Sequence, residues 1–379
     1  MVSHVSDPVR MRLDAVAGSL LEDLLRFACE GLQLTPTLHG LADERYRTIS
    51  ELLADPSSFF AAYDPDIYPQ GSFLIGTTVR PILRCEYDLD FVMQLSSATP
   101  RDPMLLLQQL EDIFKAHGTY KNMVRRLKRC VRLVYAGDFH MDILPAVSED
   151  EHSTRILVPD RALKNWKSSN PRGFATWFQQ RQRVMRFDRA ASVESLPAMQ
   201  SVDEKSALQR VVQLIKRARD RYVTNLELSP RSVVLTTMAG EGYTGSLSTA
   251  GAMSSVLQHL RDLVAGSHGP LRVYNPANPD ELLSEQWVSN PDAYREFTRW
   301  LAWFSDEWTK VMTAERVPEL KQLLSTLFGE DVAIDAIKKH AVHMEEQRKA
   351  EKLKINSRGA ITAAAGVASI RSNTFYGDE

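Results

Sequence analysis

The sequence predicts an α+β fold in which a module that contains strands is followed by a helical module. Residues 86–95 (EYDLDFVMQL) alternate between apolar and polar side chains, which is the period of a strand. From about residue 160 onward, apolar residues recur at helical spacing instead. The length of 379 residues exceeds that of a usual single domain. We therefore expect a boundary near 155–170, with a core over 1–160, a helical domain over 161–355 and a mobile tail over 356–379.

The first module is expected to begin with helices and to continue with strands. Residues 9–62 place apolar side chains at helical spacing on both sides of a break at Pro36–Gly40. A strand, an amphipathic helix and two further strands are then expected at 86–95, 103–117, 129–135 and 138–144. A tight turn at Ala136-Gly137 would join the last two strands, so they should be neighbours in a sheet.

The second module is expected to be built from helices. Asn170-Pro171 predicts the start of a helix that runs through Trp177. Ser201 and Glu204 have the spacing of a capping box, which predicts a helix from there to about Tyr222. Further helices are expected at 231–243, 248–264, 291–313, 318–328 and 332–354, with a long connection over 266–290.

Composition excludes several classes of protein. Hydrophobic residues make up 44% and charged residues 25% of the chain, which argues against a disordered, collagenous or coiled-coil protein. The net charge of −2 argues against a strongly cationic nucleic-acid coat protein. Three scattered cysteines indicate a reducing compartment rather than a disulfide framework or a zinc site. No signal peptide and no bilayer-spanning apolar segment is recognisable, so we expect a soluble cytoplasmic protein that does not contact membranes.

Three acidic residues are the first candidates for chemistry. Asp88 and Asp90 lie two apart on a predicted strand, so their carboxylates point from the same face. Asp142 lies on another predicted strand, and the three carboxylates converge if the two strands are neighbours. Such a cluster repels itself unless divalent cations lie among the oxygens, and oxygen ligands suit Mg²⁺ or Mn²⁺. The alternative interpretation is that the doublet is merely the solvated face of an edge strand.

A glycine-containing turn precedes this strand and is typical of phosphate binding. Gly71 permits close approach of the backbone to a phosphate, and Ser72 can donate its hydroxyl at the start of a helix. The spacing to Gly76 and Thr77 resembles a Walker A loop, but the essential lysine is absent. We therefore exclude a P-loop, and an ordinary turn is the alternative to a phosphate site.

The sequence resembles the bacterial cGAS/DncV-like nucleotidyltransferases (CD-NTases) of CBASS anti-phage systems. The similar strings are GSFLIGTTVRP, EYDLDFV, FHMDILPA, PDRALKNWKSSNPRGFATWF and QRVVQLIKRARD, which cover most of residues 60–245. The resemblance implies a polymerase-β-like nucleotidyltransferase core with a mixed or antiparallel sheet, followed by a helical domain like that of oligoadenylate synthetases. It also implies that NTPs, with ATP or GTP expected, are joined into a cyclic di- or trinucleotide messenger with release of pyrophosphate.

The resemblance further implies roles for individual residues. Gln70, Gly71 and Ser72 would bind the donor nucleotide. Asp88, Asp90 and Asp142 would be the catalytic acids, would bind two Mg²⁺ ions, for which Mn²⁺ can substitute, and Asp142 would help to deprotonate the attacking hydroxyl. The family places a phosphate-binding lysine on the helix near residues 208–222, and Lys216 is the candidate. Ser232 is a weaker match to a nucleotide-contacting serine. For the basic face of that helix, simple solvation is the alternative.

Other motifs are given structural interpretations. The basic run Lys121–Arg132 has no interleaved aromatic residues, and we predict no obligatory nucleic-acid partner. The glycines at 240, 242 and 245 match a dinucleotide fingerprint, but no repeated strand–helix–strand pattern surrounds them. His340 and His343 lie on a Lys- and Glu-rich helix without a third ligand nearby, so we expect a surface helix rather than a metal site.

Two further functions and one partner remain open at this point. A transferase that adds one nucleotide to an RNA, protein or small-molecule acceptor would use the same acids. A regulatory module that binds nucleotides without turnover is another alternative, against which the three clustered acids argue. The tail ends in Phe375, Tyr376 and Glu379, and the family resemblance suggests that an E1/E2-like conjugating protein binds this end. A terminal glutamate is not typical of a conjugated terminus, so plain disorder is the alternative.

Overall fold

The computed structural model describes most of the chain, with short gaps. The described residues are 8–82, 87–96, 102–135, 139–150, 153–182, 194–314 and 316–350, together with the residue pairs 354–355, 361–362 and 368–369. The turn expected at Ala136-Gly137 and nearly all of the expected tail lie outside these residues.

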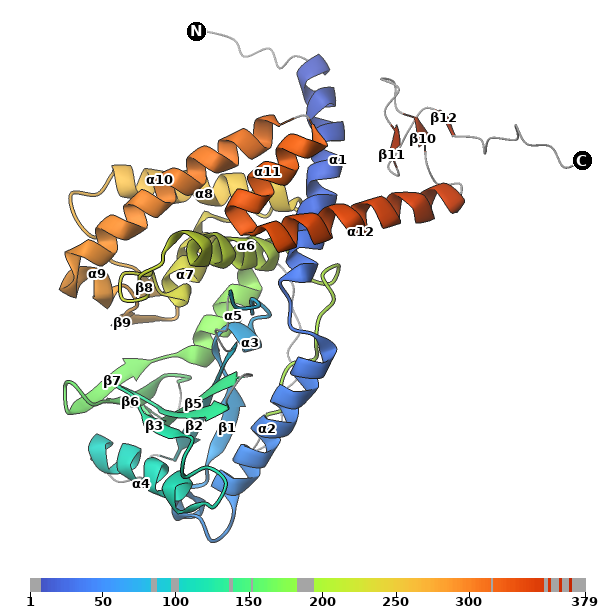
Figure 1. Cartoon of the computed structure of the whole chain (residues 1–379). Helices are drawn as coiled ribbons and strands as arrows, with labels where there is room; N and C mark the ends of the chain where they lie inside the picture. Colours follow the sequence, from blue (N-terminus) through green and yellow to red (C-terminus); the bar gives the residue numbers. More distant parts are fainter. Residues whose placement is uncertain are drawn as a thin grey trace, which may run out of the picture.

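A mixed sheet of seven strands forms one part of the molecule (Figure 1). The strands run in the spatial order β1-β2-β5-β4-β3, and β6 and β7 extend the sheet from the far end of β5. Their bounds are β1 Asp66–Pro69, β2 Tyr87–Leu95, β3 Val124–Arg126, β4 Val131–Tyr135, β5 Phe139–Ser148, β6 Ile156–Asp160 and β7 Asn165–Ser169. Only the pair β2·β5 is parallel among these described strands. The sheet is therefore mixed, as expected.

Helices form the rest of the molecule and lie mostly on one side of the sheet in Figure 1. Three helices belong to the N-terminal half beside the sheet: α2 Pro36–Ala54, the short α3 Gly71–Leu74 and α4 Pro103–Ala116. A 3₁₀ turn, η1, covers Phe59–Tyr63. The remaining helices are α1 Pro8–Gly31, α5 Pro171–Arg181, α6 Ala207–Tyr222, α7 Ser232–Gly242, α8 Thr249–Ala265, α9 Glu285–Ser289, α10 Pro291–Thr313, α11 Val317–Phe328 and α12 Glu330–Lys349.

Two large hydrophobic cores hold these elements together. One core joins α2, α4 and one face of the sheet, with buried side chains such as Tyr46, Phe91 and Phe114. The other joins the helices from α5 to α12 and also takes in α1. The cores therefore do not follow chain order, because the first helix packs among the last ones. The division of the chain near residue 160 stays a prediction.

Most predicted elements are present, and their caps explain where they begin. Asn170 caps α5 with its side chain, as predicted from Asn170-Pro171. The predicted start of the next helix at Ser201 was wrong, because the capping box is formed by Ser206 and Gln209 instead. The side chain of Glu204 accepts a hydrogen bond from the Ser201 amide, but this contact closes a turn before α6. A cap-like spacing therefore occurs twice, and only packing selects one.

The stretch 266–290 is more ordered in structure than a plain connection. It contains the hairpin β8 Tyr274–Asn275 and β9 Asn278–Leu282, followed by α9. After α12, which ends at Lys349, the described pairs β10 Lys354–Ile355, β11 Ile361–Thr362 and β12 Ala368–Ser369 form a small separate sheet. Among the described residues, no helix combines the length and the apolar character that crossing a bilayer requires.

The two rejected motifs have structural roles. Gly240 and Gly242 lie in α7, where added Cβ atoms would come within 2.5 Å of Trp177 and 2.7 Å of His259. These two glycines therefore allow Trp177 and His259 to pack closely against α7. His340 lies 3.4 Å from Asp23 of α1, and His343 contacts the ring of Phe27. Both histidines thus face α1, so this part of α12 is a packed helix rather than a fully exposed one.

Candidate active site

Three carboxylates meet on neighbouring strands of the sheet. The parallel register of β2 and β5 places Asp90 directly beside Asp142 and Asp88 beside His140. Because side chains alternate along β2, Asp88 and Asp90 share the face opposite to the buried Leu89. The convergence expected from the sequence therefore arises from one strand pairing.

Burial and mutual repulsion set the charge of Asp90. Its pKa is raised to about 8, first by burial and then by the neighbouring charges of Asp142 and Asp88. A carboxylate in this position binds protons or other cations more readily than an exposed one. The acidic cluster is therefore not fully neutralised by positive charge next to Asp90.

Arg132 supplies the positive charge that the structure places next to these acids. It lies on β4 directly opposite Asp142 in the antiparallel pair β4·β5. Its guanidinium donates to both oxygens of Asp142, from Nε at 2.6 Å and from Nη2 at 2.8 Å. Nη2 also lies 3.5 Å from Asp88. Hydrogen bonding to Asp142 raises the pKa of Arg132, so the guanidinium stays charged.

The turn after β1 is fixed against the same strand. The amide of Gln70 donates to the carbonyl of Asp90 at 2.9 Å, which continues the β1·β2 ladder by one residue. Gly71 follows with a φ of +64°, and a Cβ atom there would lie 2.8 Å from Oδ2 of Asp90. Only glycine meets both conditions without strain. Ser72 is then held at the first turn of α3, next to the acids.

One face of α6 holds the segment that follows α3. Nζ of Lys216 donates to the carbonyl and the hydroxyl of Thr77, at 3.1 and 3.2 Å. Gln213, one turn earlier, donates to the carbonyl of Thr78 at 2.7 Å. The basic helix predicted from the sequence is therefore not simply solvated, because Lys216 is only 5% exposed.

The charge on Lys216 is sensitive to its surroundings. Its pKa is lowered to about 7, chiefly by burial and next by the nearby positive charge of Arg219. Arg219 is itself held in place, because its guanidinium donates to the hydroxyl of Ser232 at 2.9 Å. Arg219 of α6 thus contacts Ser232 at the first residue of α7, and its charge acts on Lys216.

A cavity of about 350 Å³ brings most of these residues together. Seven of the eight residues predicted from the sequence line it: Gln70, Gly71, Ser72, Asp88, Asp90, Lys216 and Ser232. Asp142 is not among the lining residues and lies beside Asp90, in contact with Arg132. Phe174 and Val233 contribute apolar wall, so the cavity has a charged end and an apolar side.

The opposite part of the lining is polar and was not anticipated from the sequence. The carboxylate of Glu281 accepts from Ser169 Oγ at 2.8 Å, from the Asn170 amide at 3.1 Å and from Asn275 Nδ2 at 2.7 Å. Ser169, Asn275 and Glu281 all line the cavity. Two of them lie in the β8–β9 hairpin, within the stretch that the sequence suggested was a plain connection.

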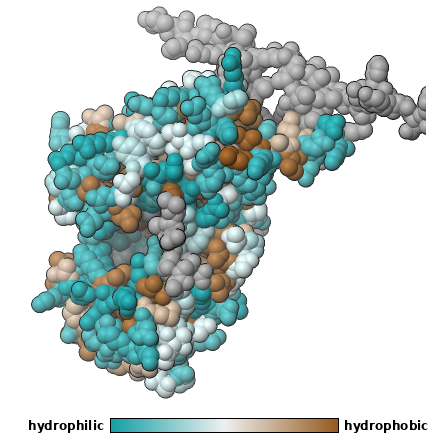
Figure 2. Space-filling view, viewed as in Figure 1, coloured by the Kyte–Doolittle hydropathy of each residue, from teal (hydrophilic) through white to brown (hydrophobic). Residues whose placement is uncertain are grey.

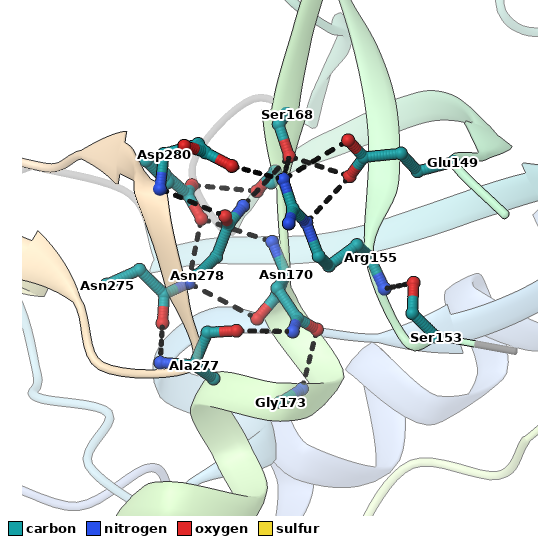
Figure 3. A network of polar contacts seen from close by, with 12 residues as sticks. Glu149, Ser153, Arg155, Ser168, Asn170, Gly173, Asn275, Ala277, Asn278 and Asp280 are labelled. Atoms are coloured by element: carbon teal, nitrogen blue, oxygen red, sulfur yellow. Dashed lines mark hydrogen bonds and ion pairs between the residues drawn. The ribbon is translucent and has the colours of Figure 1, made fainter.

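A polar network ties that hairpin to the sheet (Figure 3). Arg155 donates to Asp280 at 2.6 Å and pairs with Glu149 at 2.8 Å, while Asn278 donates to Ser168 at 2.9 Å. These contacts connect β9 with β5, β6 and β7. The hairpin is therefore a fixed wall of the cavity.

The carboxylate oxygens of the three acids suit a magnesium ion, but Arg132 competes for one of them. Asp88, Asp90 and Asp142 offer oxygen ligands only, and the raised pKa of Asp90 indicates a local excess of negative charge; both features fit Mg²⁺. In the part of the chain that the structure describes, however, no three acidic, His or Cys side chains are grouped closely enough to enclose an ion. Arg132 instead occupies the oxygens of Asp142. A three-carboxylate site therefore requires this ion pair to open.

Comparison with known proteins gives consistent matches. Residues 19–182 match the Second Messenger Oligonucleotide or Dinucleotide Synthetase domain. A c-di-GMP synthase of Roseivirga ehrenbergii is 31% identical over 380 residues, which cover 97% of this chain and 100% of that protein.

The chain belongs to the CD-NTase family.

The cyclic dinucleotide synthase CdnG of Bradyrhizobium diazoefficiens is 27% identical, over 88% of this chain and 84% of that protein. The solved structure of CdnG in complex with GTP matches the structure of this chain with a TM-score of 0.69 at 26% identity. The match covers 85% of this chain and 99% of CdnG. The present chain, like the other members of its family, is a nucleotidyltransferase that synthesises a cyclic oligonucleotide. Its fold is the polymerase-β-like fold expected from the sequence.

Three residues near the site were not predicted from the sequence, and only Arg132 carries a sequence signal that could have indicated its position. Arg132 is the last residue of the basic run Lys121–Arg132, for which the sequence predicts no obligatory nucleic-acid partner and no role in the site. Its alternation with the buried Val131 and Leu133 places it on the polar face of β4, but only the register shows that it faces Asp142. Glu281 and Asn275 carry no such signal, because their position depends on the fold of a loop-rich stretch.

Proposed function

We propose that this CD-NTase joins two GTP molecules into cyclic di-GMP. The identity of the nucleotide is supported by the c-di-GMP synthase of Roseivirga ehrenbergii, to which the chain is similar over nearly its full length. GTP bound to CdnG supports the same choice. The main observation behind the proposal is that Ser72, Asp88, Asp90 and Lys216 all line the same cavity.

In this proposal, each part of the cavity has a defined task. Gly71 and Ser72 bind the donor triphosphate through their backbone amides and the Ser72 hydroxyl, and Gln70 binds the nucleotide through its side chain, because its amide is held by Asp90. Lys216 contributes a positive charge to the same phosphates, and Ser232 contacts the nucleotide near the start of α7. The apolar wall beside Phe174 excludes water from the reacting phosphate.

The proposed reaction is a nucleotidyl transfer carried out twice. A ribose hydroxyl of one GTP attacks the α-phosphate of the other, an O–P bond forms, and the bond to pyrophosphate breaks. A second transfer closes the ring and releases a second pyrophosphate. Two Mg²⁺ ions, or Mn²⁺ in their place, would supply charge stabilisation for the attacking and leaving oxygens. Asp88, Asp90 and Asp142 would hold these ions, and Asp142 would accept the proton of the attacking hydroxyl.

Product analysis tests this proposal. The pure protein is incubated with Mg²⁺ and each labelled NTP alone and in mixtures, and the phosphatase-treated products are analysed by mass spectrometry. A parallel sample is digested with nuclease P1, which cleaves 3′–5′ linkages and so reports the linkage type. Cyclic di-GMP from GTP alone is the expected product. A different cyclic product would correct the base identity, and a single nucleotide on an RNA, protein or drug acceptor would support the transferase alternative. Absence of pyrophosphate release in every mixture would support a binding module without turnover.

The cellular setting belongs to the same proposal. We infer an anti-phage role in the cytoplasm from the family, together with an E1/E2-like partner for the C-terminal end. Residues 372–379 lie outside the described residues, so this partner is supported by the sequence alone. Deleting residues 372–379 should leave synthesis in vitro unchanged and reduce protection against phage in cells. Full protection by the shortened chain would contradict the partner.

A further inference from the structure

A second cavity lies behind the segment that forms one wall of the active-site cavity. Its volume is about 730 Å³, within the range of small-molecule sites. Leu74 and Ile75 line both cavities, and Phe73, Gly76 and Thr78 line the second one only. The segment 73–78 therefore separates the two cavities and is exposed to whatever occupies either of them.

Lys205 places a positive charge in the lining of the second cavity. It lines the cavity, it is only 7% exposed, and its ammonium group has no hydrogen-bond or ion-pair partner among the described residues. Burial lowers its pKa to about 8, and the one further influence is the Cys29 thiol. A buried ammonium without a counter-ion is costly, so such a group normally has an anionic partner.

The lining also includes the exposed carboxylate of Glu204, which accepts from the Ser201 amide and is not among the groups that shift the pKa of Lys205. Most other polar groups of the lining are side-chain amides, and one of these is unpartnered. Oε1 of Gln179 is buried and accepts no hydrogen bond, although acceptors of this kind are nearly always satisfied. The rings of His39 and Phe73 lie 5.2 Å apart on another side of the cavity. Lys205 thus requires an anion, Gln179 requires an N–H or O–H donor, and the two rings provide a surface for a planar group.

We propose that this cavity is a second binding site for a phosphorylated small molecule with a planar, hydrogen-bonding ring, of the size of a nucleoside monophosphate. Lys205 binds the phosphate, and Gln179 accepts from the ring or its substituents. Gln209 shapes the floor, since its Nε2 is fixed by the Ile75 carbonyl and by Gln200, both at 2.9 Å.

A ligand bound in the second cavity would change the charge of Lys216 in the active site. Lys216 lines the active-site cavity and donates to Thr77, whereas Lys205 lines the second cavity together with Gly76 and Thr78, so the two lysines lie on either side of segment 73–78. An anion bound to Lys205 neutralises a positive charge behind this segment and so favours the charged ammonium of Lys216 in front of it. This coupling rests on the proposed role of Lys216 in triphosphate binding, whereas the binding site itself does not.

Calorimetric titration of GMP into the full-length protein tests the site. Wild-type protein is expected to bind GMP, Lys205→Met to bind it at least about tenfold more weakly, and Lys216→Ala to bind it as wild type does. The two variants distinguish the cavities, because each removes one lysine from one of them. Loss of GMP binding in Lys216→Ala with retention in Lys205→Met, or no binding to the wild type, would overturn the proposal.

Thermal unfolding without any ligand provides an independent arm. A lysine kept for an absent anion destabilises the empty protein, so Lys205→Met should raise the unfolding midpoint. The exposed Lys321→Met is the matched control and should leave it nearly unchanged. A lowered midpoint in Lys205→Met would show that the lysine is structural and would contradict the proposal.

The coupling is measured separately by binding of a non-hydrolysable GTP analogue. GMP should strengthen analogue binding in the wild type and only compete with it in Lys205→Met. Competition in both proteins would remove the coupling. If the analogue binds to neither protein, the proposed function fails, while the GMP titration still decides the second site.

Discussion

Asp88, Asp90 and Asp142 place three carboxylates on one face of two neighbouring strands, with Asp90 and Asp142 side by side. Burial and like charges raise the pKa of Asp90 to about 8, so the cluster is unfavourable without a cation. A protein that needed only stability would replace one of these acids by an amide. We therefore expect the cluster to hold a cation that takes part in the proposed reaction.

The first prediction removes two of these charges. Asp88→Asn combined with Asp90→Asn should reduce pyrophosphate release at least about a thousandfold, because charge stabilisation of the transition state is lost. The free energy of unfolding should be unchanged or higher, because repulsion falls. Asp306→Asn, at an exposed position of α10, is the control and should have wild-type activity. Activity near wild type in the double variant would refute the metal assignment.

The second prediction concerns Lys216. Lys216→Ala should raise the KM for GTP, with a deficit that shrinks at high salt, and it should cost some stability because the contacts with Thr77 are lost. Because the pKa is about 7, the charged fraction falls as the pH rises through 7. Affinity for GTP should therefore fall from pH 6 to pH 8 more steeply in the wild type than in Lys216→Arg, which stays charged.

The control for this experiment follows from the structure. Arg219 is unsuitable, because it donates to Ser232 in the site. Arg221 is exposed on the same helix, and Arg221→Ala should leave KM and its pH dependence unchanged. Equal effects of Lys216→Ala and Arg221→Ala would reduce Lys216 to part of a general basic surface.

Strand pairing determines the site at the scale of elements. The order β2-β5-β4 places Asp90, Asp142 and Arg132 in one row, because each is opposite the next in the register. A shift of one residue in either pair would turn a side chain to the other face of the sheet. The same ladder extends to Gln70, which places Gly71 against Asp90. The turn at Gly71 and the acids are thus positioned by a single sheet.

The third prediction follows from the competition between Arg132 and a metal for Asp142. Arg132→Gln should tighten Mn²⁺ binding several-fold, because the metal no longer has to displace a bidentate guanidinium. Without metal, the same variant should be less stable, because an acidic cluster is left without its counter-ion. Calorimetric Mn²⁺ titration and thermal unfolding with and without Mg²⁺ measure the two effects.

A matched variant separates this effect from a general loss of charge. Arg125 is exposed on β3, the strand next to β4, and Arg125→Gln should change neither Mn²⁺ affinity nor stability appreciably. Weaker Mn²⁺ binding in Arg132→Gln would show instead that Arg132 holds Asp142 in the metal-binding orientation.

The two parts of the whole molecule are joined beside the active-site cavity by a set of ion pairs. Glu285 of α9 pairs with Arg129 and Lys167 from the sheet part and with Arg231 at the start of α7. These cations outweigh burial and lower the pKa of Glu285 to about 2. Figure 2 shows the surface hollowed between the helical and the sheet parts.

The fourth prediction tests this connection through pH. The folded pKa of Glu285, about 2, lies below its ordinary value of 4.5, so its ion pairs stabilise the fold above about pH 5 and are lost as the pH falls toward 2. Glu285→Gln should therefore be less stable than the wild type at pH 7, and the difference should shrink in acid. Glu319→Gln, at an exposed position of α11, is the control. A difference that does not change with pH would exclude the ion pairs as its source.

The sequence by itself determined the chemistry of the site. Alternation over 86–95 fixed the face on which Asp88 and Asp90 lie, and the backbone demands of a phosphate turn singled out Gly71 and Ser72. Period and caps also predicted most helices, because these signals are local. The wrong helix start at Ser201 has the same origin, since local spacing cannot tell which of two caps the packing will use.

Only the tertiary structure decided which residues from distant parts of the chain lie next to one another in the site. The pairing of Arg132 with Asp142, the placement of Glu281 and Asn275 in the cavity and the isolation of Lys205 all join residues that are distant in sequence or depend on strand register. The packing of α1 among the C-terminal helices is of the same kind. Such contacts arise from the burial of apolar faces between whole elements, which is a property of the assembled chain and leaves no mark in a short stretch of residues.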